Sequence, residues 1–223
     1  MKATTINKKT IIGMVAALVV ITVLVVSFGF NRTRGNMTVS GNIPVSKLHG
    51  SFSINFDNIN ELVGDADYVF VGAVISEDGT EYKHPVMGES EDGEEYEIAS
   101  PYTNYTISVL DNIKGELVTD TEIPIQKAGG LAQDGSQYFV YEEDELPKQG
   151  SVYVFYAYAQ PDGSLLVSGP NSNEKINVKA KAVTDDPTGS LETISAVQEV
   201  IDALDTQVET GRTRFVSTYD ANQ

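Results

Sequence analysis

The chain has no cysteine among its 223 residues. This absence excludes disulfide bonds, catalysis by a thiolate and zinc sites with cysteine ligands. It also excludes a lipoprotein that is acylated on an N-terminal cysteine. Any covalent or metal chemistry would therefore have to come from other side chains.

Motifs that carry catalytic chemistry are also missing. The two histidines, His49 and His84, lie in a linker and in an inserted loop, without a partner at metal-ligand spacing. The sequence has no His-Glu-x-x-His helix, no nucleophile elbow and no Walker loop. The segment Ser172–Lys175 spells Ser-x-x-Lys, but it falls in a polar break before a strand rather than on a helix turn, so we attribute it to chance.

Basic residues are scarce, with 15 Lys and Arg against 32 Asp and Glu and a formal net charge of −17. The basic residues near the N-terminus are Lys2, Lys8, Lys9, Arg32 and Arg34. The chain beyond them holds ten basic residues and all 32 acids, a net of −22. Such a surface repels nucleic acid and anionic lipid headgroups, and it favours cationic, neutral or metal-ion partners. The alternative is that the acidity only keeps an exported protein soluble.

The segment from Ile11 to Phe30 contains no charged residue. As a helix, these 20 residues would measure about 30 Å, the thickness of the hydrocarbon core of a bilayer. The lysines before the segment slightly outnumber the arginines after it, which favours a cytoplasmic N-terminus for residues 1–10. We therefore expect an uncleaved signal-anchor over residues 11–30, which places the rest of the chain outside a cell membrane. The alternative is a cleaved signal peptide and a secreted protein, although Ser27–Gly29 is a poor cleavage site.

Beyond this segment we expect a linker over residues 31–53, one folded domain over residues 54–210 and a frayed tail over residues 211–223. Asp57–Gly64 reads as a short helix with Asp57 as N-cap and Gly64 as its stop. Residues 190–210 read as an amphipathic helix that starts at Ser190 and stops at Gly211. Its apolar stripe is Leu191, Ile194, Val197, Ile201, Leu204 and Val208.

Between these helices the sequence alternates as β-strands do. The expected strands are 68–76, 102–113, 120–127, 137–141, 151–159, 165–168 and 175–183. Gly72 suggests a bulge, and residues 77–100 read as an exposed hairpin extension or a mobile loop. The fold class is mainly β (α+β), a small five- to seven-stranded barrel with a short N-terminal helix and a C-terminal amphipathic helix, and a sandwich is the alternative.

A family resemblance covers about residues 58–178. It comprises the strand Ala66–Gly72, a strand that ends at Ile113–Gly115, the Gly129–Gly130 loop, and Gly150 followed by Tyr153 with Phe155 or Tyr156. This order resembles a recurring type of bacterial surface domain, which is similar to the OB-like barrel of tissue-inhibitor and netrin-type modules. The absence of cysteine fits the surface of a Gram-positive bacterium. The animal inhibitors chelate the metal of their target through an N-terminal cysteine, so the resemblance does not imply that mechanism here. Residues 168–172 also replace the usual glycine-rich segment.

Two sets of residues are candidate sites. The acids of the 77–100 insertion could bind calcium through their oxygens, although their spacing is not that of a known calcium loop and a solvated acidic loop is the alternative. These calcium candidates are Glu89, Glu91, Asp92, Glu94 and Glu95. The acids of residues 142–145 are interpreted in the same way. We expect no other cofactor.

The tyrosines of the second half of the domain are the other set. Tyr138, Tyr141, Tyr156 and Tyr158 are candidates for a binding surface, because exposed aromatic side chains on a barrel often form a ligand platform. The alternative is that they pack in the sheet and the core. Together these features predict a membrane-anchored extracytoplasmic domain that binds a protein or a cell-wall component. The alternatives are a carboxylate-dependent extracellular hydrolase and a secreted form.

Overall fold

The computed structural model describes residues 43–89, 92–178 and 194–223. The predicted membrane segment, residues 11–30, lies outside this part of the chain. Within the described residues, none of the helices has the length and apolar character needed to cross a bilayer.

The described chain is mainly β, as predicted. Its strands are β1 (Val45–Leu48), β2 (Tyr68–Glu89), β3 (Glu95–Lys114), β4 (Glu122–Ala128), β5 (Gly130–Leu131), β6 (Tyr138–Tyr141), β7 (Val152–Ala159), β8 (Leu165–Val167) and β9 (Asn173–Ile176). Its helices are α2 (Ile59–Asp65) and α5 (Ser195–Asp205).

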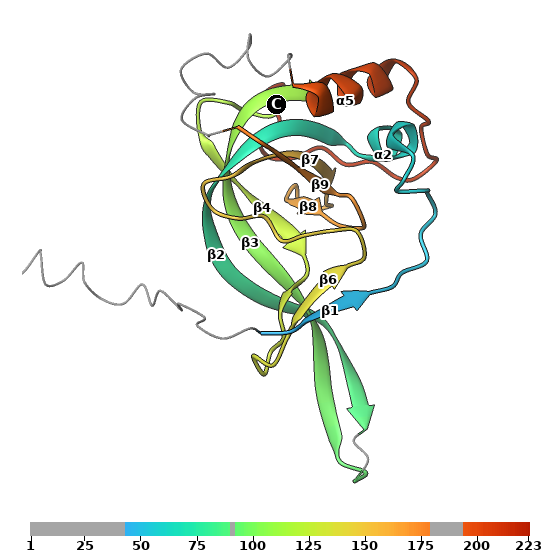
Figure 1. Cartoon of the computed structure of the whole chain (residues 1–223), viewed down its shortest axis with the longest axis vertical. Coiled ribbons are helices and arrows are strands. Elements are labelled where there is room, and N and C mark those ends of the chain that lie inside the picture. Colours follow the sequence, from blue (N-terminus) through green and yellow to red (C-terminus); the bar gives the residue numbers. More distant parts are fainter. Residues whose placement is uncertain (1–42, 90–91, 179–193) are drawn as a thin grey trace, which may run out of the picture. The chain divides into compact units, whose positions relative to one another are not determined.

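Five strands close into a barrel, which excludes the sandwich alternative (Figure 1). The strand order is β2-β3-β4-β8-β7, and β7 pairs back onto β2 with Phe70 opposite Phe155. All neighbours are antiparallel except β4 and β8, which run parallel where Gln126 lies opposite Leu166. β9 extends the same edge of β7 that β8 occupies. The interior is filled by large side chains such as Phe70, Tyr105 and Phe155.

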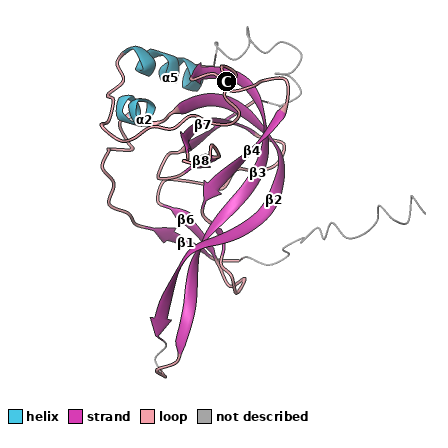
Figure 2. Ribbon diagram, turned by 180° about the vertical axis from the view of Figure 1, so that it is seen from behind, coloured by secondary structure: helices cyan, strands magenta, loops and turns pink. Residues whose placement is uncertain are grey.

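The first part of β2, Tyr68–Val74, and strand β7 are buried on both faces, which explains their nearly continuous apolar sequences. Alternate residues, including Val69, Val71 and Val154, point away from the barrel interior and contact α2 and α5. Figures 1 and 2 show the two helices lying together over this outer face. The predicted bulge at Gly72 is confirmed, because the pairing with β3 shifts between Val71 and Gly72. A Cβ at Gly72 would lie 2.6 Å from Cγ2 of Ile107, so a side chain does not fit there.

The predicted helix boundaries need correction. The N-cap of α2 is Asn58, not Asp57, because the Asn58 side chain accepts a hydrogen bond from the Asn60 amide. Gly64 lies inside the helix, which continues one residue further to Asp65. Helix α5 spans Ser195–Asp205 rather than residues 190–210, and the predicted cap Ser190 lies outside the described residues.

The buried face of α5 consists of Val197, Val200 and Ala203. Val197 belongs to the predicted stripe, whereas Ile194, Ile201 and Leu204 are only partly buried. Val208 is 50% exposed because the helix has already ended, and its amide instead donates to the Asn60 carbonyl.

Residues 77–100 form the predicted hairpin extension. β2 and β3 keep pairing past the barrel up to Glu89 opposite Glu95, with register shifts between Glu77 and Gly79 and between Lys83 and Val86. We call the distal part of this hairpin, Val86–Glu89 with Glu95–Ser100, the arm. Figure 2 shows it extending away from the barrel.

Part of the predicted linker is structured. Residues 45–48 form β1, which pairs in parallel with β6, and β5 completes this small sheet. At the other end, β9 begins two residues earlier than predicted, and residues 179–183 of the expected last strand lie outside the described residues.

The predicted frayed tail is instead docked on the domain. Arg212 and Arg214 both form ion pairs with Asp67. Further along, Ser217 is fully buried, and its amide donates to the Tyr68 hydroxyl. Asp220 forms a β-bridge with Leu117. The tail is held by contacts with residues that are far away in the sequence. The local sequence of residues 211–223 does not predict these contacts.

Candidate functional site

A charged pair lies inside the barrel. Lys127 follows Ile123 and Ile125 at strand spacing on β4, and this alternation points its side chain inward. Its Nζ forms an ion pair with Oδ2 of Asp144, and neither side chain has any exposed surface. Nζ also donates to Oγ of Ser172, at 2.5 Å. Asp144 comes from the loop between β6 and β7, and Ser172 directly precedes β9, so the cluster joins three parts of the chain.

Burial acts on both members of the pair. It lowers the pKa of Lys127 and raises the pKa of Asp144, because each charge is taken out of water. Their mutual attraction opposes both shifts. We interpret the pair as ionised, since each charge is the close partner of the other.

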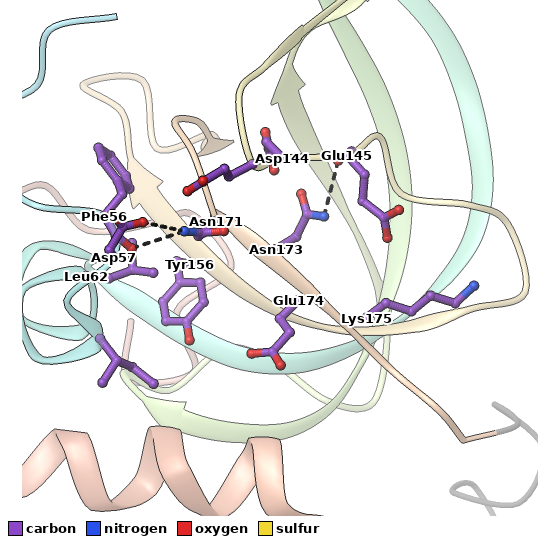
Figure 3. Close-up of a pocket in the computed structure, with 12 residues that line it drawn as sticks. Phe56, Asp57, Leu62, Asp144, Glu145, Tyr156, Asn171, Asn173, Glu174 and Lys175 are labelled. Carbon is purple, nitrogen blue, oxygen red and sulfur yellow. Dashed lines mark hydrogen bonds between the residues drawn. The ribbon is translucent and has the colours of Figure 1, made fainter. Parts of the chain in front are cut away.

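A pocket of about 530 Å³ lies next to this pair. Its walls are the start of α2 with the residues before it, the acidic segment 143–145, Tyr156 of β7 and residues 171–175, as Figure 3 shows. The apolar lining comes from Phe56, Ile59, Leu62 and the Tyr156 ring. Asp144 is part of both the ion pair and the pocket, because its Oδ2 binds Lys127 and the residue also lines the pocket.

Two buried oxygen atoms at this pocket accept no hydrogen bond from any described residue. They are Oδ1 of Asp144 and Oδ1 of Asn173. The orientation of the Asn173 amide is fixed, because its Nδ2 donates to the Glu145 carbonyl at 3.2 Å (Figure 3). Buried acceptors are nearly always paired in folded proteins, and leaving one unpaired costs about 1–3 kcal/mol. Both atoms have almost no accessible surface, so they lie behind the wall of the pocket rather than facing its open space.

The backbone of the pocket is held in an uncommon conformation. Glu143 and Asn171 have positive φ angles of 54° and 51°. The Asn171 amide donates to the Glu143 carbonyl at 3.2 Å, and its side chain donates to the Phe56 carbonyl at 3.3 Å. Asn adopts this conformation readily, whereas Glu does so at a cost. Such strain concentrates at functional sites, and here the strained residue, Glu143, lines the pocket.

The charges around the pocket are predominantly negative. Four further carboxyl groups line it, and Lys175 is the cation among its lining residues. These carboxyls belong to Asp57, Glu143, Glu145 and Glu174. The interaction of Glu143 with Asp57 raises the pKa of Glu143. Partial burial, together with the charge of Glu199 on α5, raises the pKa of Glu174. Of the two shifts, only that of Glu143 is caused by another acid of the pocket.

A nucleophilic role for Ser172 has no geometric support. The contact between Ser172 and Lys127 resembles a serine–lysine pair, but both residues are completely buried. Lys127 is also ion-paired with Asp144, so it is not free to accept a proton as a general base. Ser172 acts instead as a hydrogen-bond partner of the lysine, and Lys175 of the Ser-x-x-Lys spelling takes no part in the cluster.

The structure separates the four candidate tyrosines. Tyr156 is buried and contributes to the pocket. The other three are half-buried. Tyr158 lies under the Arg212 guanidinium, 5.0 Å from ring centre to Cζ, and Tyr141 packs edge-on against Phe52. Tyr138 lines a different cavity beside β1. The four side chains thus do not form one platform.

The calcium candidates lie at the tip of the hairpin. Glu89 ends β2 and Glu95 begins β3, with Asp92 and Glu94 between them, and Glu91 lies outside the described residues. The described residues contain no group of three or more acidic or histidine side chains arranged to hold a metal ion. Calcium binding by the full set stays a prediction.

Comparison with known proteins gives no assignment. No protein-family model and no curated protein sequence matches this chain. The inference about function therefore rests on the pocket itself.

Proposed function

We propose that the chain is a membrane-anchored extracytoplasmic binding domain without catalytic activity, and that the pocket beside Asp144 takes a cationic group of a protein or cell-wall ligand. The single observation that carries this proposal is the acidic lining of this pocket around an apolar wall, formed by Asp57, Glu143, Glu145 and Glu174. In this proposal residues 11–30 are the membrane anchor. If this segment is cleaved, the alternative is a secreted form of the same domain.

A cation with N–H donors fits this pocket on two counts. An ammonium group brings three donors and a guanidinium group five, and neither has an acceptor that would compete with the protein oxygens. Its charge would stabilise the ionised form of Glu143, whose pKa is raised by a hydrogen bond with Asp57 and by the charge of Asp57. The apolar wall of Phe56 and Leu62 suits the methylene stem that carries such a group in a lysine or arginine side chain.

The barrel supports the expected resemblance to OB-like modules. We propose that the barrel is OB-like. It is a closed ring of five strands with one parallel pair, β4 with β8, and it carries a helix on its outer face. Folds of this kind serve many functions, so the fold is consistent with a binding domain but does not identify the ligand.

The hydrolase alternative receives less support at this pocket. A glycosidase-type mechanism needs two carboxyl groups with distinct protonation states in one cleft. Among the pocket acids only Asp144 is buried, and it is committed to Lys127. The other acids, such as Glu145 and Glu174, are exposed.

The proposal can be tested with 1,5-diaminopentane as the probe. Isothermal titration with the full-length chain in mild detergent should show binding that weakens about two- to fivefold in Glu143→Gln and in Glu174→Gln, since each exposed ion pair contributes up to about 1 kcal/mol. Glu122→Gln is the matched control, because Glu122 is an exposed acid of β4 that does not line the pocket. Equal affinity in all four proteins would refute the pocket as the binding site.

A further inference from the structure

The arm carries an apolar patch on one face. Val86 lies opposite Ile98 and Gly88 opposite Tyr96 in the β2–β3 ladder, so these four residues share a face. Val86, Tyr96 and Ile98 are 60%, 49% and 44% exposed. A Cβ at Gly88 would lie 3.0 Å from Cδ1 of Ile98 and 3.1 Å from Cζ of Tyr96, so both side chains fold over the glycine into one continuous patch.

The opposite face of the arm is acidic. Met87 lies opposite Glu97, and Glu89 lies directly opposite Glu95. Like charges at directly opposed positions destabilise a β-ladder, and a two-stranded ribbon alone is only marginally stable in water. The arm therefore combines an exposed apolar face with a face that carries Glu89, Glu95 and Glu97 beside Met87.

The two edges of the arm differ. The β2 edge is interrupted by Pro85 and by a positive φ of 53° at His84, and the pairing shifts between Lys83 and Val86. Such features block the addition of another strand. The β3 edge is regular from Glu95 to Ser100, and among the described residues no strand pairs with it on its outer side.

One hydrogen bond shows which residues of this edge direct their backbone N–H and C=O groups outward. The Pro101 carbonyl accepts from the Gly129 amide at 2.9 Å, so Pro101 faces away from β2. Alternate residues of a strand direct their backbone groups to the same edge. The N–H and C=O groups of Ala99, Glu97 and Glu95 consequently face outward.

We infer that the β3 edge of the arm is a docking site for an extended segment of a partner protein in which apolar residues alternate with lysine or arginine. An added strand alternates its side chains between the two faces of the ribbon. Its apolar residues would pack beside Tyr96 and Ile98 on β3, and its basic residues would neutralise Glu95 and Glu97. A second copy of the arm is disfavoured, because it would bring these same acids against each other. This inference is independent of the pocket.

The probe is a fluorescein-labelled hexapeptide of alternating valine and lysine, blocked at both ends, and the readout is fluorescence anisotropy with the full-length chain in mild detergent. Ala99→Pro removes one outward N–H and should weaken binding at least fivefold. Ala99→Val keeps that N–H and should bind within twofold of the wild type. Ile98→Ser and the double variant Glu95→Gln/Glu97→Gln test the two faces without altering the backbone, and each should weaken binding at least threefold.

Circular dichroism and thermal unfolding would verify that each variant keeps the fold. Equal binding by Ala99→Pro and Ala99→Val, unchanged binding by both face variants, or equal binding of an alternating valine–glutamate hexapeptide would overturn the inference. Concentration-dependent dimerisation that Ala99→Pro abolishes would also overturn it, because the occupant would then be a second copy.

Discussion

Lys127 and Asp144 form an ion pair inside the barrel, with no solvent exposure of either side chain. The pair connects β4 to the loop that forms one wall of the pocket. Asp144 thereby keeps one carboxylate oxygen on the lysine, while the other, Oδ1, has no partner among the described residues. The same residue, Asp144, therefore belongs both to a buried ion pair of the fold and to the lining of the proposed binding pocket.

The first prediction concerns the removal of one partner of this pair. Lys127→Met should destabilise the protein by about 3–5 kcal/mol, because it leaves a buried carboxylate without a counter-charge. The double variant Lys127→Met/Asp144→Leu should recover most of this loss, since neither charge is then buried. Urea denaturation followed by far-ultraviolet circular dichroism measures both values. A cost below about 1 kcal/mol for the single variant would show that Asp144 is not held as a charged partner.

The second prediction concerns the dependence of stability on alkaline pH. Partial burial lowers the pKa of Lys114 from 10.5 to about 8, so between these values the unfolded chain binds more protons than the folded chain and stability rises with pH. Burial raises the pKa of Tyr68 from 10.0 to about 12, so above pH 10 the folded state holds the extra proton and stability falls.

Unfolding free energies measured from pH 7.5 to 11 would test both signs. Lys114→Met should flatten the rise between pH 8 and 10, and Tyr68→Phe should reduce the fall above pH 10. A wild-type profile that falls throughout this range, with Lys114→Met parallel to it, would contradict the shift at Lys114.

The third prediction concerns the docked tail. Arg214 donates to the carbonyls of Gly64 and Asp65 at 2.6 and 3.0 Å, where α2 ends, and it also pairs with Asp67. Arg214→Ala should lower the free energy of unfolding by about 1–3 kcal/mol, because it removes several partly buried hydrogen bonds and one ion pair, although Lys114 and Arg212 still donate to the same carbonyls. Asn222→Ala, at the exposed end of the tail, should have no measurable effect on thermal unfolding. Equal melting temperatures for the two variants would mean that the tail does not stabilise the domain.

Local pattern was sufficient for much of the fold. Strand periodicity located the barrel strands, and the same alternation that buries Ile123 and Ile125 also points Lys127 inward. The sequence did not indicate that a lysine would be tolerated there, because its partner Asp144 is one of four consecutive acids from Glu142 to Glu145. Only the three-dimensional path of this loop distinguishes Asp144 from its neighbours.

The pocket and the tail depended on contacts between distant segments. Asn171 contacts both Phe56 and Glu143, and Arg214 contacts the end of α2. The contact of Asn171 with Phe56 spans 115 residues of sequence, and that of Arg214 with Gly64 spans 150. A polar segment such as 211–223 reads as a tail until its partners are known. Tyr156 and Tyr158 were candidates for a binding surface, with packing in the sheet and core as the alternative. Helices cover the outer face of their strand β7, and there Tyr156 is buried.

The most direct test of the cationic pocket is to compare two ligands of equal length with the full-length chain, 1,5-diaminopentane and 1,5-pentanediol. Both can donate hydrogen bonds, but only the diamine is charged. We expect calorimetric titration to detect binding of the diamine and not of the diol. Lowering the pH through the raised pKa values of Glu143 and Glu174 should weaken diamine binding, since protonation removes their charge. Equal affinity for the two ligands, or no binding of either, would contradict a pocket built for a cation.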